Sequence, residues 1–150
     1  MGFAKTMQIS ASALTAERLW MDVVSSNIAN AYTTRPEGPY RRRMVVLRPN
    51  STDSSFQAVL SHQVARGSQG NVVGSGVRVS RIVEDASPGE RVYEPDHPDA
   101  DEEGYVTYPN VNMVTEMVDL LAASRAFQAN VTVINALKST ALKALSIGSR

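Results

Sequence analysis

The sequence of 150 residues contains no cysteine. Disulfide bonds, zinc sites with thiolate ligands and cysteine nucleophiles are therefore excluded, while the redox compartment stays open. The chain also lacks any run of about 18 apolar residues, the length that a membrane-spanning helix needs. Residues 1–20 contain no uninterrupted apolar segment of the kind found in signal peptides. We therefore expect neither a membrane span nor secretion by a signal peptide.

A net charge is also lacking, because 15 basic residues balance 15 acidic ones. No overall field attracts nucleic acid or a membrane surface. The charges are nevertheless unevenly placed. Residues 1–50 carry seven basic and three acidic side chains, residues 51–108 carry four and ten, and residues 109–150 carry four and two. Two interpretations stay open: ordinary surface scatter, or a segregation that orients like subunits against one another.

A first helix is predicted over residues 3–29. This segment contains no proline or glycine that would interrupt a helix. At 100° per residue, two adjoining apolar stripes cover an arc of about 200°. That arc is too broad for a single partner helix. The first stripe contains Phe3, Met7, Leu14, Met21, Val24 and Ile28, and the second contains Ile9, Ala13, Ala16, Trp20 and Val23. Three polar residues interrupt the arc: Ser10, Glu17 and Asn27.

A second helix is predicted over residues 113–147, about 50 Å long. Asn112 is placed to cap its start, Glu116 falls in the first turn, and Gly148 is a natural stop. The spacing of its main stripe alternates between four and three residues, which is typical of a coiled-coil seam. That stripe contains Met113, Met117, Leu120, Ser124, Phe127, Val131, Ile134, Lys138, Ala141 and Leu145.

Between the helices, three short patterns of β-branched or aromatic residues predict strands: "YRRRMVVLRP", "GVRVSRIVED" and "GYVTYP". Their connections are rich in turn-forming residues, so we expect one or two antiparallel hairpins. The fold class is therefore α+β, with long terminal helices forming a coiled-coil-like layer and a small β element inserted between them. We expect residues 1–34 and 109–150 to form a discontinuous helical domain and residues 35–108 to form the rest.

Three segments resemble chemical sites without meeting their requirements. The acidic loop around His97 offers oxygen ligands but lacks the spacing of a calcium loop, and His62 lies in a Ser/Gln-rich segment. The glycine-rich residues 67–76 lack the Lys-Ser/Thr ending of a phosphate loop. The arginines at 41–43 have no aromatic stacking platform beside them, so we interpret them as solvated or as bridging subunits. We predict no enzymatic activity, cofactor or metal site.

The two predicted helices present more apolar surface than they and a minimal β element can cover. Neighbouring subunits should supply the missing core. The stretches "SSNIANAYTTRPEGPYRRRMVVL" and "GYVTYPNVNMVTEMVDLLAASRAFQANVTVINALKSTALKALSIG" strongly resemble the bacterial flagellar basal-body rod proteins, and within them those of the proximal rod. Tyr32 stands where the resemblance leads us to expect asparagine, and it has no assigned role.

The resemblance implies a structural subunit that polymerises into the rod and transmits motor torque. It implies export through the flagellar type III apparatus without a cleaved signal peptide, and assembly within the periplasm. The implied partners are copies of the chain, other rod proteins and the ring-to-rod adaptor. Nucleic acid, a small-molecule substrate and direct membrane insertion are not implied. The alternatives are another axial subunit of the rod or hook type, or a small enzyme or non-flagellar binding domain.

Interface residues also follow from the resemblance. The apolar candidates on the helices are Met7, Leu14, Met21, Val24, Ile28, Met113, Met117, Leu120, Phe127, Val131 and Ile134. The positions after the first helix are Ala29, Asn30, Thr33 and Thr34, and the polar positions of the C-terminal block are Asn112, Glu116, Arg125, Gln128 and Asn130. A polar residue on a buried stripe often fixes register, so Gln128 and Asn130 are candidates for selecting the neighbour.

The unpaired apolar surface yields a first prediction for the purified protein. Its circular dichroism should show low helix content and loose chain ends until polymerisation supplies the missing contacts. A small enzyme would instead melt cooperatively from a fully helical starting state. A sharp thermal transition of a fully helical monomer would contradict the assembly hypothesis.

Overall fold

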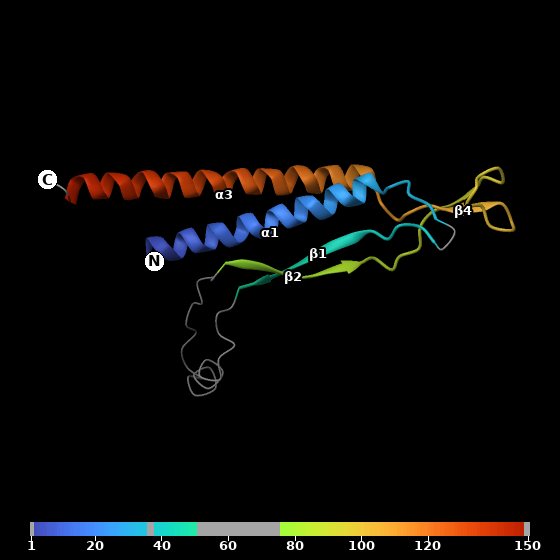
Figure 1. Ribbon diagram of the computed structural model, residues 1–150, viewed down its shortest axis with the longest axis horizontal. Helices are drawn as coiled ribbons and strands as arrows, with labels where there is room; N and C mark the ends of the chain where they lie inside the picture. The colour runs from blue at the N-terminus through green and yellow to red at the C-terminus, as the bar shows by residue number, and fades with distance from the viewer. Residues whose placement is uncertain (1, 36–37, 51–75, 149–150) are drawn as a thin grey trace, which may run out of the picture.

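The computed structural model describes residues 2–35, 38–50 and 76–148. Two long helices, α1 (Phe3–Ala29) and α3 (Met113–Gly148), lie antiparallel and form one layer. A two-stranded ribbon lies beneath α1, and a second, shorter hairpin extends beyond the point where the helices meet (Figure 1). This arrangement confirms the predicted α+β class. No helix in the described part of the chain combines the length and apolar character required to cross a membrane.

Helix α1 is buried on two sides, as the breadth of its apolar arc predicted. One side packs against α3 and the other against the ribbon. Val23 and Val24 are buried between these neighbours, and each contributes about 1.5 to 3 kcal/mol by leaving water. Two residues that interrupt the arc, Ser10 and Asn27, are buried as well. The interruptions are therefore part of the packed surface.

The least exposed row of α3 alternates steps of three and four residues, which confirms a coiled-coil-like seam. The observed seam and the predicted stripe share the residues that recur every seven positions. At each position between them, the seam contains the residue one place earlier in the sequence, for example Glu116 instead of Met117. It contains Met113, Glu116, Leu120, Ala123, Phe127, Asn130, Ile134, Leu137 and Ala141. The predicted stripe members Met117, Lys138 and Leu145 are exposed in this subunit.

Polar pairing across the helices explains this shift. The Asn130 side chain donates a hydrogen bond of 3.0 Å to Glu17 Oε1, and the second carboxylate oxygen of Glu17 is buried without a protein partner. Burial raises the pKa of Glu17 above its ordinary value, and the hydrogen bond from Asn130 offsets part of that increase. A search for apolar residues alone selects Val131 over Asn130 and so misplaces the seam.

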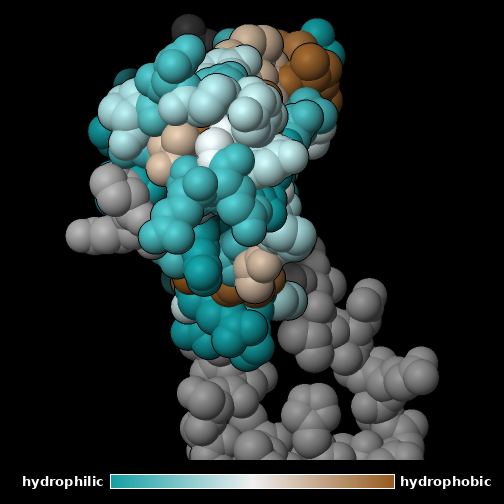
Figure 2. Space-filling model, turned by 90° about the vertical axis from the view of Figure 1, so that its right-hand side faces the viewer, coloured by the Kyte–Doolittle hydropathy of each residue, from teal (hydrophilic) through white to brown (hydrophobic). Residues whose placement is uncertain are grey.

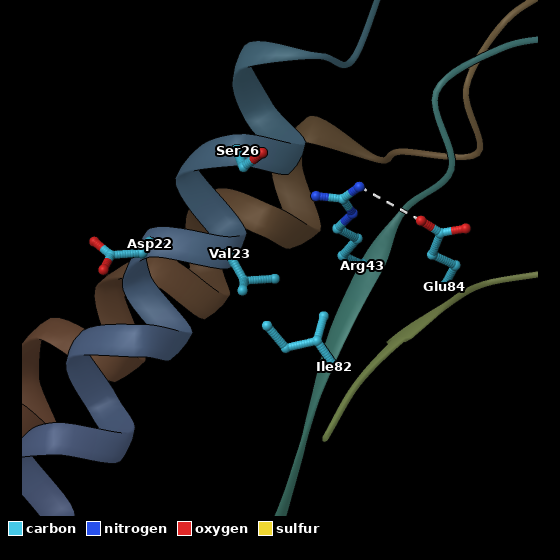
Figure 3. Close-up of a pocket in the computed structure, with 6 residues that line it drawn as sticks. All are labelled: Asp22, Val23, Ser26, Arg43, Ile82 and Glu84. Carbon is cyan, nitrogen blue, oxygen red and sulfur yellow. Dashed lines mark hydrogen bonds and ion pairs between the residues drawn. The ribbon is translucent and has the colours of Figure 1, made fainter. Parts of the chain in front are cut away.

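The ribbon consists of β1 (Arg43–Pro49) and β2 (Val77–Glu84), paired antiparallel with a bulge after Val46. Val23 of α1 and Ile82 of the ribbon line an open hollow between the two elements (Figure 3). The ribbon is also fastened to α1 at its far end, where Val77 N donates 3.1 Å to Ser12 Oγ. Gly76 is required at this approach because a Cβ atom there would overlap Ser12, and because its φ is +101°.

The second hairpin consists of β3 (Arg91–Tyr93) and β4 (Tyr105–Thr107). The sequence analysis predicted β4 but missed β3, although both strands have three residues. Asp101 organises the connecting loop. It accepts hydrogen bonds from the backbone N–H groups of Glu103 and Tyr105, and it pairs with Arg91 at 2.7 Å. These contacts hold the pKa of Asp101 below its ordinary value, and the hydrogen bond from the Tyr105 N–H has the largest effect.

Helix α1 ends at Ala29, as predicted, and Asn30 follows it without the left-handed conformation that is common at helix C-termini. Asn30 has φ −106° and ψ 15°, and its side chain closes the helix instead. The amide Nδ2 donates 2.8 Å to Ser26 O, while Oδ1 accepts from Thr33 Oγ1 at 3.2 Å. Asn112 caps α3 as expected, because its Oδ1 accepts from the N–H groups of Val114 and Thr115.

The partly buried carboxylate of Glu17 predicts a pH dependence. Because its pKa is raised in the folded state, its contribution to stability is fully present below the ordinary value of 4.5 and is lost as the pH rises through the folded pKa. Glu17→Gln keeps an acceptor for Asn130 and removes the charge. We expect the variant to retain more helix at about pH 7 than the native chain, measured by circular dichroism. Equal pH profiles would contradict this account.

Candidate subunit interface

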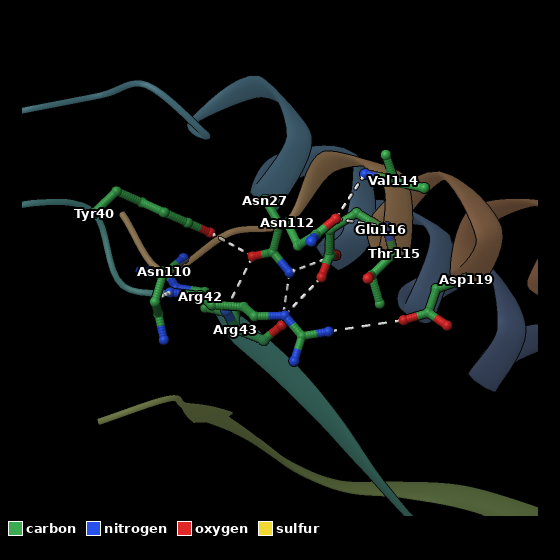
Figure 4. Close-up of polar contacts among 10 residues, drawn as sticks. All are labelled: Asn27, Tyr40, Arg42, Arg43, Asn110, Asn112, Val114, Thr115, Glu116 and Asp119. Atoms are coloured by element: carbon green, nitrogen blue, oxygen red, sulfur yellow. Dashed lines mark hydrogen bonds and ion pairs between the residues drawn. The ribbon is translucent and has the colours of Figure 1, made fainter. Parts of the chain in front are cut away.

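Three distant segments of the chain meet at the junction between the end of α1 and the start of α3 (Figure 4). Glu116, on the first turn of α3, is fully buried, and Asn27 of α1 is 1% exposed. Asn27 Nδ2 donates 2.9 Å to Glu116 Oε2 and 2.8 Å to Arg43 O. We call this group of Asn27, Tyr40, Arg42, Arg43 and Glu116 the polar junction.

Arg42 supplies the charge that Glu116 requires. Its Nε donates 2.6 Å to Glu116 Oε1, and its Nη2 lies 3.7 Å from Asp119 Oδ2. A buried carboxylate without such a partner is strongly destabilising. The expectation that the arginines at 41–43 are solvated or bridge subunits is therefore wrong for Arg42, because its partner lies within the same chain. Hydrophobic periodicity carries no signal for such a pair.

Asn27 organises the chain that leaves α1. Its Oδ1 accepts hydrogen bonds of 2.9 Å from Tyr40 Oη and from Arg43 N. One amide group thus binds the loop after α1, the first residue of β1 and the start of α3. An aspartate cannot reproduce this pattern, because a carboxylate has no donor for Glu116 or for Arg43 O.

The predicted interface residues fall into two groups in this subunit. Several are buried or partly buried: Leu14, Met21, Val24, Ile28, Asn30, Thr33, Thr34, Met113, Glu116, Leu120, Phe127, Asn130, Val131 and Ile134. The others are exposed: Met7, Ala29, Asn112, Met117, Arg125 and Gln128. Asn130 contacts α1, whereas Gln128 lies on the exposed surface. Their roles between subunits remain predictions.

The acidic loop makes contacts within the subunit. Thr34 Oγ1 donates 2.6 Å to Asp99 Oδ2, which joins the loop after α1 to the second hairpin. His97 Nδ1 accepts from the N–H of Asp99 at 3.1 Å. Among the described residues, no three histidine or acidic side chains are grouped so as to hold a metal ion. His62 and residues 67–75 of the glycine-rich segment lie outside the described residues.

The sequence analysis placed Asn27 and Glu116 on the helices, but it did not predict the main contact of either residue. Asn27 was treated as an interruption of the arc and Glu116 as a partner of the helix dipole, whereas each binds the other. One sequence signal could have indicated these contacts: Asn27 and Glu116 are polar residues on helix faces that are otherwise apolar, and Arg42 follows α1. All three groups are engaged in structural contacts, so the junction holds the three segments together.

The polar junction yields a second substitution test. Glu116→Ala leaves the guanidinium of Arg42 and the amide of Asn27 without their buried acceptor, which should cost about 3 kcal/mol of local stability. Amide hydrogen exchange around both helix ends should then be faster by about a hundredfold. Asp119→Ala is the matched control, because that more exposed pair should contribute less than about 1 kcal/mol. Equal exchange in both variants would argue against the central role of Glu116.

Comparison with known proteins matches both helical ends of the chain. Residues 7–36 match a family model described as "Flagella basal body rod protein". Residues 102–147 match a family model described as "Flagellar basal body rod FlgEFG protein C-terminal". The first match contains the end of α1 and the exit of the chain, and the second contains β4 and nearly all of α3. The matched segments thus contain the seam of α3 and two members of the polar junction, Asn27 and Glu116.

Full-length relatives share this similarity throughout. The flagellar basal-body rod protein FlgC of Bacillus subtilis is 50% identical over 149 residues, covering 95% of this chain and 96% of the relative. FlgC of Borreliella burgdorferi is 43% identical and FlgC of Escherichia coli O6:H1 is 41% identical, with coverage of 98% and 99% of both chains, respectively. The chain therefore belongs to the FlgC family of flagellar basal-body rod proteins.

Proposed function

We propose that this structural rod subunit polymerises through its terminal helices into the proximal rod, the drive shaft that transmits motor torque. In this proposal, residues 1–34 and 109–150 form the assembly domain. Residues 35–108 form an outer part that braces the helices. The polar junction joins the two parts, so torque applied to one part is passed to the other through a rigid contact rather than a hinge.

The observation that carries the proposal is the imbalance between buried and exposed apolar groups. Among the described residues, six apolar side chains are buried, and only Val23, Val24 and Val106 are larger than alanine. Helix α3 meanwhile exposes large apolar side chains along its length: Val114, Met117, Val118, Leu121, Val133, Leu142, Leu145 and Ile147. Exposed apolar surface of this extent marks an interaction site.

The proposal includes the route and the neighbours of the subunit. Export proceeds through the flagellar type III apparatus without a cleaved signal peptide, and polymerisation follows in the periplasm. Copies of the chain, adjacent rod proteins and the ring-to-rod adaptor provide the partners. Membership in the FlgC family supports assembly with rod components, and full-length similarity to FlgC proteins favours this role over that of another axial subunit.

A structural role without catalysis fits the chemistry of the subunit. The buried carboxylate of Glu116 is committed to Arg42 and Asn27, and the partly buried carboxylate of Glu17 is bound to Asn130. Both carboxylate oxygens of Glu116 thus have structural partners. The relatives are named as rod proteins, which agrees with a load-carrying function.

The seam residues test the assembly proposal in flagellated cells. Leu120→Asp and Ile134→Asp each place a charge on the partly buried seam of α3, which costs several kcal/mol without a partner. We expect export to continue while rod assembly and motility are lost. The measurements are the secreted amount of the chain, its presence in isolated basal bodies and swimming in soft agar. Wild-type swimming with either change would refute the role of the helices.

An outward-facing position separates contacts between subunits from contacts within one subunit. Val118 is 62% exposed, so Val118→Asp should leave the subunit fold intact and reduce incorporation into basal bodies at least tenfold. Thr132→Asp, at an exposed polar position of the same helix, is the control and should swim normally. If both variants assembled equally well, the exposed apolar surface of α3 would not be an interface.

A further inference from the structure

The ribbon of β1 and β2 is covered on one face only. Among the described elements, each of its strands contacts only the other strand and α1. Val77, Val79 and Ile82 line hollows between the ribbon and α1 (Figure 3), so these side chains point toward the helix. Successive side chains of a strand point to opposite faces. The neighbouring residues Arg78 and Arg81 therefore point away from α1.

Two arginines stand directly opposite each other on this outer face. Arg48 of β1 is the pairing partner of Arg78 of β2, and both are exposed. Directly opposed side chains have their Cβ atoms about 5 Å apart, and like charges in such positions destabilise a ribbon. The pairing nevertheless continues past them, because Asn50 N donates 2.8 Å to Gly76 O. The ribbon therefore holds two positive charges side by side.

The other charges of the ribbon are arranged differently. Arg43 is opposite Glu84, and their charged groups lie 3.5 Å apart on the face toward α1. Glu84 is the only acidic residue in the two strands. The outer face thus carries three exposed arginines and no acidic residue of β1 or β2. We call Arg48, Arg78 and Arg81 the cationic face.

The subunit does not balance the charge of the cationic face. The ion pairs between described residues use Arg42, Arg43 and Arg91, and none of them includes an arginine of this face. Residues 51–75, which connect the two strands in sequence, contain one acidic and one basic residue, Asp53 and Arg66. Their net charge is therefore zero. A balancing negative charge has to come from another molecule.

The acidic second hairpin of another copy is a poor source of that charge, because three of its carboxylates are already bound. Asp101 pairs with Arg91 at 2.7 Å. Asp99 and Glu94 accept hydrogen bonds of 2.6 and 3.0 Å from hydroxyl groups of the same subunit. Moving these carboxylates to the ribbon of a neighbouring copy would break existing contacts. A different protein with unengaged carboxylates fits better.

The layout of the cationic face favours carboxylates on a polypeptide. Arg81 lies three residues from Arg78, about 10 Å along the strand, so the guanidinium groups are spread out instead of converging on one anion. Each guanidinium can hold a carboxylate through two parallel hydrogen bonds. The partly buried Val46, opposite Arg81, adds an apolar contact. Neither strand contains an aromatic residue on which a nucleic-acid base could stack.

We propose that the cationic face binds an acidic segment of a different protein of the basal body. This inference rests on the proposed assembly into the rod and adds a second, electrostatic contact surface. Viewed from the end that carries the second hairpin, hydrophobic surface gathers at the top, at the height of α3 (Figure 2). The ribbon lies on the opposite side of α1. Apolar contacts through α3 and charged contacts through the ribbon therefore do not compete.

The scarcity of lysine makes a direct chemical test possible, because residues 6–137 contain none. Arg48→Lys, Arg78→Lys and Arg81→Lys each place one amine on the ribbon and keep the charge. A water-soluble carbodiimide joins an amine to a carboxylate in contact with it, forming an amide bond with loss of water. Basal bodies are isolated from flagellated cells in which one variant replaces the native chain. We expect a cross-link between the introduced lysine and an aspartate or glutamate of another protein, identified by mass spectrometry.

Arg91→Lys is the positive control, because position 91 lies beside Asp101 and should couple to it within the hairpin. The native chain, which has arginine at all four positions, is the negative control. A cross-link from the ribbon to a carboxylate of the same chain or of a second copy would overturn the proposal. So would the absence of any ribbon cross-link while Arg91→Lys couples, which is the result that a phosphate-bearing partner would give.

Arg78→Glu separates docking from folding. In the purified subunit it turns a repulsive cross-strand pair into an attractive one, so amide exchange across the ribbon should slow. In cells it places a carboxylate against the acidic partner and should reduce incorporation into basal bodies severalfold. Arg41→Glu makes the same charge change at an exposed position before β1 and should incorporate normally. Faster exchange in the ribbon, or equal incorporation of both variants, would overturn the proposal.

Comparison with the seam variant Leu120→Asp distinguishes failure of the docking from failure of polymerisation. If Arg78→Glu assembles and swims like the native chain while Leu120→Asp does not, the docking is wrong and polymerisation through the helices stands. If Leu120→Asp also assembles and swims, the polymerisation on which the docking rests is wrong. Reduced incorporation of both variants, together with slower exchange in the ribbon of Arg78→Glu, is the result we expect.

Discussion

The fold depends on keeping one carboxylate charged and satisfied in a fully buried position. Glu116 is held by an arginine from the chain after α1 and by an amide from α1 itself. Each of these groups would be costly alone, because a buried ion or amide without partners loses its hydration and gains nothing in return. Together they permit only one arrangement of three segments. The junction therefore specifies geometry more than it adds stability.

Polar pairs also fix the geometry of the seam between α1 and α3. Its apolar residues favour association of α1 with α3 over a range of registers, since one leucine replaces another at small cost. The Glu17 and Asn130 pair and the Asn27 and Glu116 pair remove that freedom, because a shifted register would leave polar groups unpaired in the interior. The outward face of α3 lacks such a constraint within the subunit, and its apolar side chains stay exposed.

Sequence reasoning located both helices, the cap at Asn112 and three of the four strands, because each has a strong local signal. It placed the seam one residue off at alternate positions, since its stripe contained Met117 and Val131 in place of Glu116 and Asn130. It also misjudged Arg42, whose partner is distant in the sequence. What escapes prediction here is the pairing of polar residues across the fold, which depends on three-dimensional proximity rather than on periodicity.

The sequence separation within the polar junction has a consequence for the order of folding. Asn27 and Glu116 are 89 positions apart, so the contact that closes the fold is a highly non-local one. Closing so large a loop is entropically unfavourable until both helices are present, which makes folding slow relative to local helix formation. In a chain that emerges from its N-terminus, the side of α1 that packs against α3 would stay uncovered until more than two thirds of the chain had appeared. The last step to complete this fold is also the one that determines its geometry.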